Sequence, residues 1–278
     1  MNRMLLSVTP MLCVSLLAIV APLHAAGQTG SGGGDAQDLA KKLANPISDM
    51  VSVPLQFNWV NGNGPQEDLK FVMNFQPVVP FAISPHWNLI GRWIMPYISQ
   101  PASLGSAAGL GDITASAFFS PSAAAGLLWG AGPVLTLPTT SDLALGSGKW
   151  EVGPTVVLVK QAGSWTYGML WNQLWSFAGT SNVDRSEISH GLFQPFLARV
   201  MPHGVTYTLQ SEATANWLAA RSSDTWTIPI NVQVSKVTRM GPFPASIAGG
   251  LGVFVVKPDG GPEWQLRTTF TMILPRKI

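Results

Sequence analysis

Hydrophobic and polar residues alternate along most of this chain, from residue 51 almost to its end. The clearest stretch covers residues 263–274, where the apolar members are Trp264, Leu266, Phe270, Met272 and Leu274 and the polar ones are Gln265, Arg267, Thr269 and Thr271. Residues 205–217 and 225–235 alternate in the same way. Because successive side chains of a strand point to opposite faces, each stretch predicts a β-strand with one apolar and one polar face.

The pattern divides into about twelve predicted strands, most of them at least as long as the 9–11 residues with which a tilted strand crosses a bilayer. They span residues 51–60, 69–83, 87–98, 112–120, 126–137, 150–160, 164–177, 189–200, 204–217, 224–237, 244–256 and 262–274. Connections after the odd-numbered strands are mostly long and polar, whereas those after the even-numbered strands are mostly tight. Outer-membrane barrels have short periplasmic turns and longer extracellular loops. The sequence therefore predicts an all-β fold, a transmembrane antiparallel up-and-down β-barrel of about twelve strands with a short N-terminal helix.

Tryptophans cluster near the ends of the predicted strands. Those near the long loops are Trp59, Trp150, Trp175, Trp217, Trp226 and Trp264, and those near the tight turns are Trp87, Trp129 and Trp165. Indole rings favour the boundary between lipid and water, so two such bands are typical of a membrane barrel.

Prolines within the predicted strands oppose this assignment, because each removes a hydrogen-bond donor and a closed barrel has no edge strand to accommodate it. The residues concerned are Pro54, Pro77, Pro80, Pro96, Pro133, Pro154, Pro195 and Pro229. We expect them to mark β-bulges, where the inward and outward sides exchange.

The N-terminal 50 residues have a different organisation. Residues 1–26 are typical of a cleaved secretory signal peptide, with Arg3 before an apolar stretch and small residues at its end. Cys13, the single cysteine, lies within it, so the exported chain has no thiol. Residues 27–50 are predicted to be a flexible segment and a short helix over 35–45, capped by Asp35, which either lies in the periplasm or plugs the barrel formed by residues 51–278.

Composition agrees with a membrane barrel. Hydrophobic residues make up 46% of the chain and charged residues only 11%, against about 25% in soluble domains. These values argue against a disordered chain and an ordinary cytosolic enzyme. The net charge of +2 is small and scattered, so no nucleic-acid partner is expected.

No catalytic residue, metal site or cofactor is predicted. The mature histidines His86, His190 and His203 lack metal-ligand spacing. Ser189 and His190 are adjacent, so they point to opposite faces of a strand and cannot form a lipase-like pair. We therefore expect that the protein is not an enzyme, with a membrane-embedded hydrolase as the least favoured alternative.

Amide and charged side chains occupy the predicted inward face. The candidates for lining the lumen are Gln56, Asn58, Asn74, Gln76, Arg92, Asn172, Gln194, Gln210, Glu212, Asn231, Gln233, Gln265 and Arg267. Amides donate and accept hydrogen bonds without a strong field, which favours a narrow, porin-like channel for small neutral or weakly polar molecules, including hydrophobic or aromatic compounds. The alternative is a satisfied polar plug in a non-conducting structural or assembly barrel. Arg92, Arg267 and Glu212 form either a constriction or structural ion pairs.

Several short phrases together carry a resemblance to a known family. They are Leu43-Ala44-Asn45-Pro46, Gln76-Pro77, Gly111-Asp112-Ile113, Gly132-Pro133, Leu137-Pro138-Thr139, Trp175-Ser176-Phe177-Ala178-Gly179, Gln194-Pro195-Phe196 and Pro258-Asp259-Gly260-Gly261-Pro262. Over about residues 38–275 the chain resembles Gram-negative outer-membrane proteins often labelled "neuromedin U", which are similar to the barrel family named for the meta-pathway of phenol degradation. The resemblance implies an outer-membrane barrel with a transport role and no catalytic residues.

This reading also implies partners. The lipid bilayer, a small-molecule solute and the outer-membrane insertion machinery are expected. That machinery usually recognises a terminal aromatic residue, whereas this chain ends after Leu274 with Pro-Arg-Lys-Ile. Phe270 and Leu274 are the expected substitutes.

Overall fold

A computed structural model describes residues 32–123, 126–179 and 187–274. The predicted signal peptide and residues 275–278 lie outside this part. One α-helix, α1 (Gly32–Leu43), precedes fifteen strand segments. These are β1 (Val51–Asn63), β2 (Asp68–Phe75), β3 (Val78–Ala82), β4 (Trp87–Gln100), β5 (Ala107–Leu110), β6 (Ile113–Pro121), β7 (Leu127–Leu137), β8 (Lys149–Ala162), β9 (Trp165–Gly179), β10 (Ser189–Val200), β11 (Val205–Gln210), β12 (Ala213–Asn216), β13 (Trp226–Met240), β14 (Phe243–Val256) and β15 (Trp264–Leu274). Three short 3-10 turns lie at Ala102–Leu104, Pro202–Gly204 and Ser222–Asp224.

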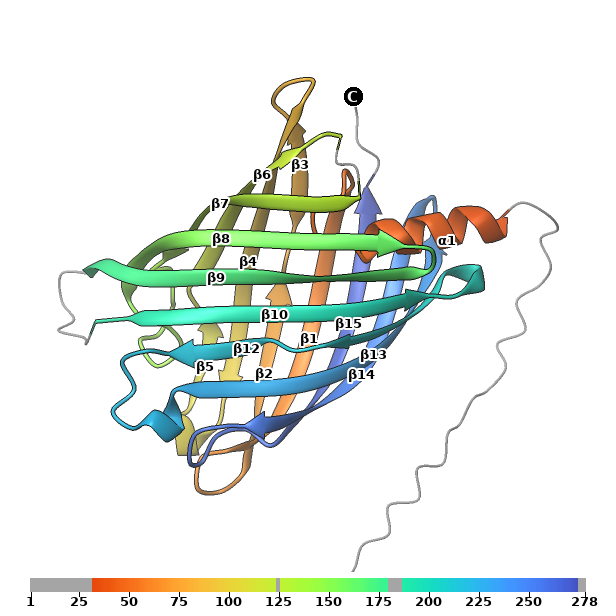
Figure 1. The fold of residues 1–278 in the computed structure, drawn as a ribbon. Coiled ribbons are helices and arrows are strands. Elements are labelled where there is room, and N and C mark those ends of the chain that lie inside the picture. The colour runs from red at the N-terminus through yellow and green to blue at the C-terminus, as the bar shows by residue number, and fades with distance from the viewer. Residues whose placement is uncertain (1–31, 124–125, 180–186, 275–278) are drawn as a thin grey trace, which may run out of the picture. The chain divides into compact units, whose positions relative to one another are not determined.

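The strands form a closed antiparallel barrel (Figure 1). Each strand pairs with its neighbour in sequence, and β15 pairs with β1 from Asn61↔Trp264 to Val51↔Leu274, which closes the sheet. The segments β2 and β3, β5 and β6, and β11 and β12 are each one interrupted strand, so the barrel has twelve strands. The predicted fold class is therefore confirmed.

Each of the three strand interruptions lies opposite a proline of the neighbouring strand. The backbone N–H of Gln76 donates to the carbonyl of Pro54 (2.9 Å), that of Gly111 to Pro96 (2.9 Å) and that of Ser211 to Pro195 (3.1 Å). A proline cannot return the second hydrogen bond of such a pair. Three prolines that lack an N–H donor therefore lie where the neighbouring strand is interrupted and regular pairing has already stopped.

The other prolines do not behave uniformly. The register between β13 and β14 shifts at Ile228/Pro229, as a bulge would require. Pro133 and Pro154, by contrast, face each other in an unbroken register between β7 and β8. The expectation of a bulge at every proline is therefore wrong for this pair, because two prolines opposite each other leave no donor unpaired.

Helix α1 begins earlier than predicted. It starts by Gly32, so Asp35 lies in its first turn and does not cap it. A carboxylate in the first turn still interacts favourably with the positive end of the helix dipole. The helix contacts the turn at Pro202–Gly204 and therefore lies at the end of the barrel that carries the tight turns (Figure 1). We call this the short-turn end, and the opposite one the long-loop end.

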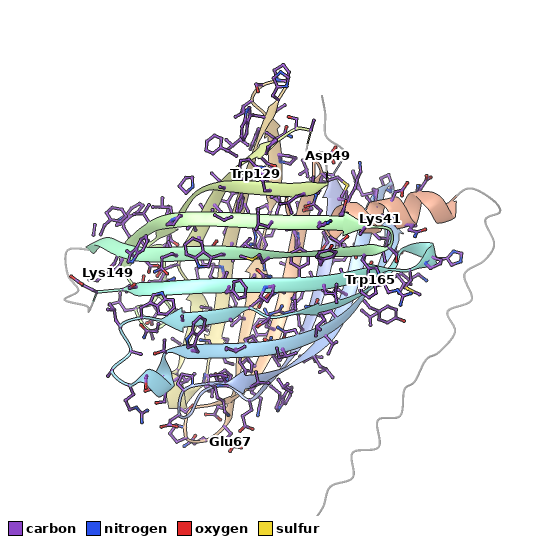
Figure 2. The ribbon with its side chains drawn as sticks, viewed as in Figure 1. Lys41, Asp49, Glu67, Trp129, Lys149 and Trp165 are labelled. Carbon is purple, nitrogen blue, oxygen red and sulfur yellow. The ribbon has the colours of Figure 1, made fainter. Side chains whose placement is uncertain are left out.

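The outer surface of the barrel is apolar between two bands of tryptophan. Eight tryptophans are more than a third exposed, among them Trp87, Trp129 and Trp165 near the short turns and Trp150 and Trp264 near the long loops. Figure 2 shows Trp165 at the opposite side of the barrel from Lys149. Leucine, valine, isoleucine and phenylalanine side chains are exposed between the bands. Nowhere in the described residues is a helix long and apolar enough to cross a membrane.

The barrel interior contains an apolar cluster as well as polar groups. Its buried members are Ile47, Ile90, Phe118, Val157, Val159 and Leu170. Val157 and Val159 lie on the inward side of β8, two and four residues beyond the buried Thr155. The expectation of a polar inward face is therefore wrong for this part of the barrel, because residues 156–159 are apolar on both sides of the strand.

Candidate functional site

A cavity of about 300 Å³ lies inside the barrel, towards the short-turn end. One side is polar and is lined by residues of β1, β11, β13, β14 and β15, such as Gln56, Gln210 and Gln233. The other side is apolar, where Leu170 and Phe196 belong to the interior apolar cluster or pack against it. A small molecule in the cavity would therefore contact hydrogen-bonding groups on one side and apolar side chains on the other.

The segment from Ala40 to Ser48 lines the short-turn end of this cavity. Ala40 is 3% exposed, and Ile47 is buried in the apolar cluster. The side chain of Gln161 at the end of β8 donates to the backbone carbonyl of Lys41 (2.9 Å). Figure 2 shows Lys41 and Asp49 at the end away from Glu67 and Lys149. Helix α1 and the residues after it thus line the short-turn side of the lumen.

A bidentate ion pair lies at the inner end of the cavity. Arg267 donates from Nη1 and Nη2 to the two carboxylate oxygens of Glu212, at 2.8 and 2.6 Å, and from Nε to Oδ1 of Asn58 at 2.7 Å. Only 4% of the Arg267 side chain is exposed. Glu212 occupies the interruption between β11 and β12, where the chain leaves the regular ladder. Each of the three guanidinium nitrogens of Arg267 therefore donates a hydrogen bond to a neighbouring side chain.

A second buried pair follows towards the long loops. The amide of Gln265 donates to Oδ1 of Asn231 across the intervening strand β14. The residue of β14 between them is Gly252, and a Cβ at this position would lie 2.0 Å from Oδ1 of Asn231. Glycine is required here because the two amides meet directly over its backbone. We call Asn58, Glu212, Asn231, Gln265 and Arg267 the interior network.

Arg92 on β4 faces the cavity with fewer partners. Its Nη2 donates to Oε1 of Gln76 at 3.1 Å, and its charge interacts with that of Glu212. Gln76 lies in the interruption between β2 and β3, and Val78 just after it is the register partner of Arg92. Two arginines thus surround one carboxylate, which leaves one positive charge in excess beside the cavity.

The structure divides the predicted lumen residues between the cavity and the buried interior. Seven line the cavity: Gln56, Gln76, Arg92, Gln194, Gln210, Glu212 and Gln233. Five are buried: Asn58, Asn172, Asn231, Gln265 and Arg267. Asn74 faces Gln56 in the register of β1 and β2, outside the cavity lining.

Sequence reasoning missed the apolar lining. Val78, Leu170 and Phe196 line the cavity, yet none is among the candidates, which are all polar. A usable signal was present at Phe196, which lies two residues from Gln194 and therefore on the same side of a strand. The alternation itself, applied without regard to polarity, places Phe196 on the inward face.

Ser189 and His190 engage groups on opposite sides of the sheet. The Ser189 hydroxyl accepts a hydrogen bond from the Gln173 amide at 3.4 Å. His190 Nε2 lies 3.5 Å from a carboxylate oxygen of the buried Glu151. The two side chains therefore do not form a nucleophile–base pair with each other.

Solved structures with a similar fold include two outer-membrane proteins. An outer-membrane channel from Pseudomonas putida F1 is 18% identical, with a TM-score of 0.61 over 82% of this chain and 97% of that one. The NanC porin is 11% identical, with a TM-score of 0.54 over 80% of this chain and 100% of that one. The sequence matches no protein-family model and no curated protein sequence. At these identities the likeness shows the fold, which is that of outer-membrane barrel channels.

Proposed function

We propose that this protein is an outer-membrane channel for small neutral or weakly polar molecules, including hydrophobic or aromatic compounds. The observation that carries the proposal is the cavity inside a closed barrel whose outer surface is apolar. A soluble protein rarely exposes so continuous an apolar surface, whereas a bilayer covers it. The fold shared with one outer-membrane channel and one porin supports the same reading.

The loop pattern supports an orientation. Short turns face the periplasm and longer loops the exterior in outer-membrane barrels. Helix α1 then lies at the periplasmic mouth, which agrees with the proposal that residues 1–26 are a cleaved signal peptide and that the insertion machinery delivers the barrel from that side. The resemblance to the "neuromedin U" and meta-pathway barrels belongs to this proposal as well.

The cavity lining supports small, weakly polar solutes. Arg92 and Glu212 are the charged residues among the described residues that line it, and glutamine, threonine and serine supply most of the remaining polar groups. Most of the polar lining is thus uncharged and offers hydrogen bonds to weakly polar groups, and the apolar side accepts hydrocarbon. We propose no enzymatic activity for the barrel.

Liposome swelling tests the proposal. The mature chain is compared with a deletion of residues 28–46, which removes α1, and with a control deletion of residues 28–31, which leaves α1 in place. We expect faster uptake of small neutral sugars after the larger deletion, because α1 and the following residues line one mouth of the cavity, and no change in the control. If no variant passes any solute, the channel proposal fails.

A non-conducting structural barrel is the second candidate, and the interior network favours it. Its buried amides and Arg267 lie between the cavity and the long loops, and Arg267 binds Glu212 in the cavity lining. Buried polar groups in a small barrel must be paired whether or not solute passes. Absence of uptake in all three preparations, with normal folding, is the result expected for this candidate.

A further inference from the structure

We infer that the cavity is a binding site for small monocarboxylates with an apolar body, whose carboxylate binds Arg92. The inference rests on the proposed channel function and extends it, because it adds molecules with one carboxylate to the neutral and weakly polar solutes proposed above. It starts from the contrast between Arg92 and Arg267, which lie on the inner face of the same barrel and differ in how many of their donors are already engaged.

Arg267 is already bound by protein acceptors. All three of its nitrogens donate to Glu212 or Asn58, and its side chain is almost completely buried. Arg92 donates within the described residues to Gln76 alone, through one Nη. A guanidinium has five N–H donors in a planar fork that matches the two oxygens of a carboxylate. Arg92 is therefore the cation with free donors at the cavity.

The carboxylate in the cavity lining does not satisfy Arg92. Glu212 also lines the cavity, but both of its oxygens accept hydrogen bonds from Arg267. The two arginines and one glutamate leave a net charge of +1, and no other charged residue is among the described lining residues. A monocarboxylate would bring the charge at this end of the cavity to zero, which a dianion or a cation would not do.

The apolar side of the cavity defines the rest of the ligand. Val78 pairs with Arg92 in the register of β3 and β4, so the guanidinium and this side chain lie beside each other on the inner face. Leu170 and Phe196 continue the apolar surface across the lining. A cavity of about 300 Å³ is at the small end of ligand sites. The fitting molecule therefore has one carboxylate and a compact hydrocarbon body.

Calorimetric titration of the mature protein in detergent tests the site. The probe is cyclohexanecarboxylate, compared with cyclohexylmethanol, which has the body without the charge, and with acetate, which has the charge without the body. We expect the acid to bind at least about tenfold more tightly than either control, the size of effect that a charge-assisted bidentate contact supplies.

Substitutions at Arg92 identify the group responsible. Arg92→Met should reduce the affinity for the acid to that for the alcohol, and Arg92→Lys should retain part of it, because an ammonium keeps the charge and loses the fork. The matched control is Lys70→Met, which removes a cation on β2 outside the cavity lining and should leave binding unchanged. Arg92→Gln replaces Arg92→Met if the latter does not fold.

Two results overturn the inference: equal affinity for the acid and the alcohol, or unchanged acid binding in both Arg92→Met and Arg92→Gln. Failure of the channel proposal is separable, because binding is measured without transport. Arg92-dependent binding in a barrel that passes no solute would retain the site and refute the channel. Passage of neutral sugars without preferential binding of the acid would retain the channel and refute the carboxylate site.

Discussion

The two halves of the barrel interior use the same residue types for different purposes. Towards the long loops, Arg267 is enclosed by Glu212 and Asn58, and the amides of Asn231 and Gln265 pair with each other. Towards the short turns, Arg92 contacts a single amide and faces a cavity. The difference teaches that the hydrogen bonds of Glu212 decide the role of each arginine. Arg267 makes both of them and is structural, whereas Arg92 makes neither and is available to a ligand.

Strand interruptions create this difference. Glu212 and Gln76 each lie at a break in a strand, and each break faces a proline on the neighbouring strand. A residue at such a break is released from the regular alternation, so its side chain can reach a partner that the pleat alone would not offer. The prolines that oppose a barrel assignment thus help to position the polar groups inside it.

The largest expected difference between the halves is in stability. Arg267→Met should lower the free energy of unfolding by about 3 kcal/mol, because it leaves Glu212 partly buried without its bidentate partner. This is the lower end for a broken buried pair, since the Glu212 side chain remains 27% exposed. Arg92→Met should cost less than about 1 kcal/mol, because it removes one hydrogen bond at the cavity. Urea unfolding in detergent measures both, and equal losses would remove the distinction between the two arginines.

Glycine positions on β14 sharpen the comparison. Gly252→Ala should cost about 1–3 kcal/mol, because the new Cβ would separate the Asn231 and Gln265 amides and leave buried polar atoms unpaired. Gly249→Ala is the control on the same strand, since a Cβ there would meet nothing within 4 Å and alanine is the better strand residue. A stable Gly252→Ala variant in the same unfolding assay would show that the amide pair contributes little.

The smallest expected effect compares two neighbours on the inward face of β1. Asn58→Ala should cost about 1 kcal/mol, because Arg267 Nε loses its acceptor. Gln56→Ala, in the cavity lining two residues away, should cost about 0.5 kcal/mol, because it removes a 3.2 Å hydrogen bond to Asn58 Oδ1 and leaves Arg267 with its acceptor. Thermal unfolding followed by the change in electrophoretic mobility of the folded barrel compares them. A larger loss at Gln56 would place the boundary between the halves elsewhere.

Much of this architecture was predictable from the sequence. The alternation of apolar and polar residues predicted all twelve strands, including the one that the structure divides at Ser211 and Glu212. The helix was predicted, but its start was not, because the glycines from Gly32 give no helical signal and the helix packs against the turn at Pro202–Gly204, which is distant in sequence. The apolar interior at Val157 and Val159 was missed because a run of apolar residues conceals which side faces inwards.

The amino-acid order alone determined that these strands have opposed faces, that long and short connections alternate, and that amides and a few charges point inwards. These properties follow from the period of two, which is local. The tertiary structure alone decided that Glu212 pairs with Arg267, which leaves Arg92 beside the cavity, and that the residues after α1 line that cavity. Glu212 and Arg267 lie 55 positions apart in the sequence, and Arg267 and Asn58 lie 209 apart. Only the closure of the sheet, which fixes the distances across its interior, brings such residues together.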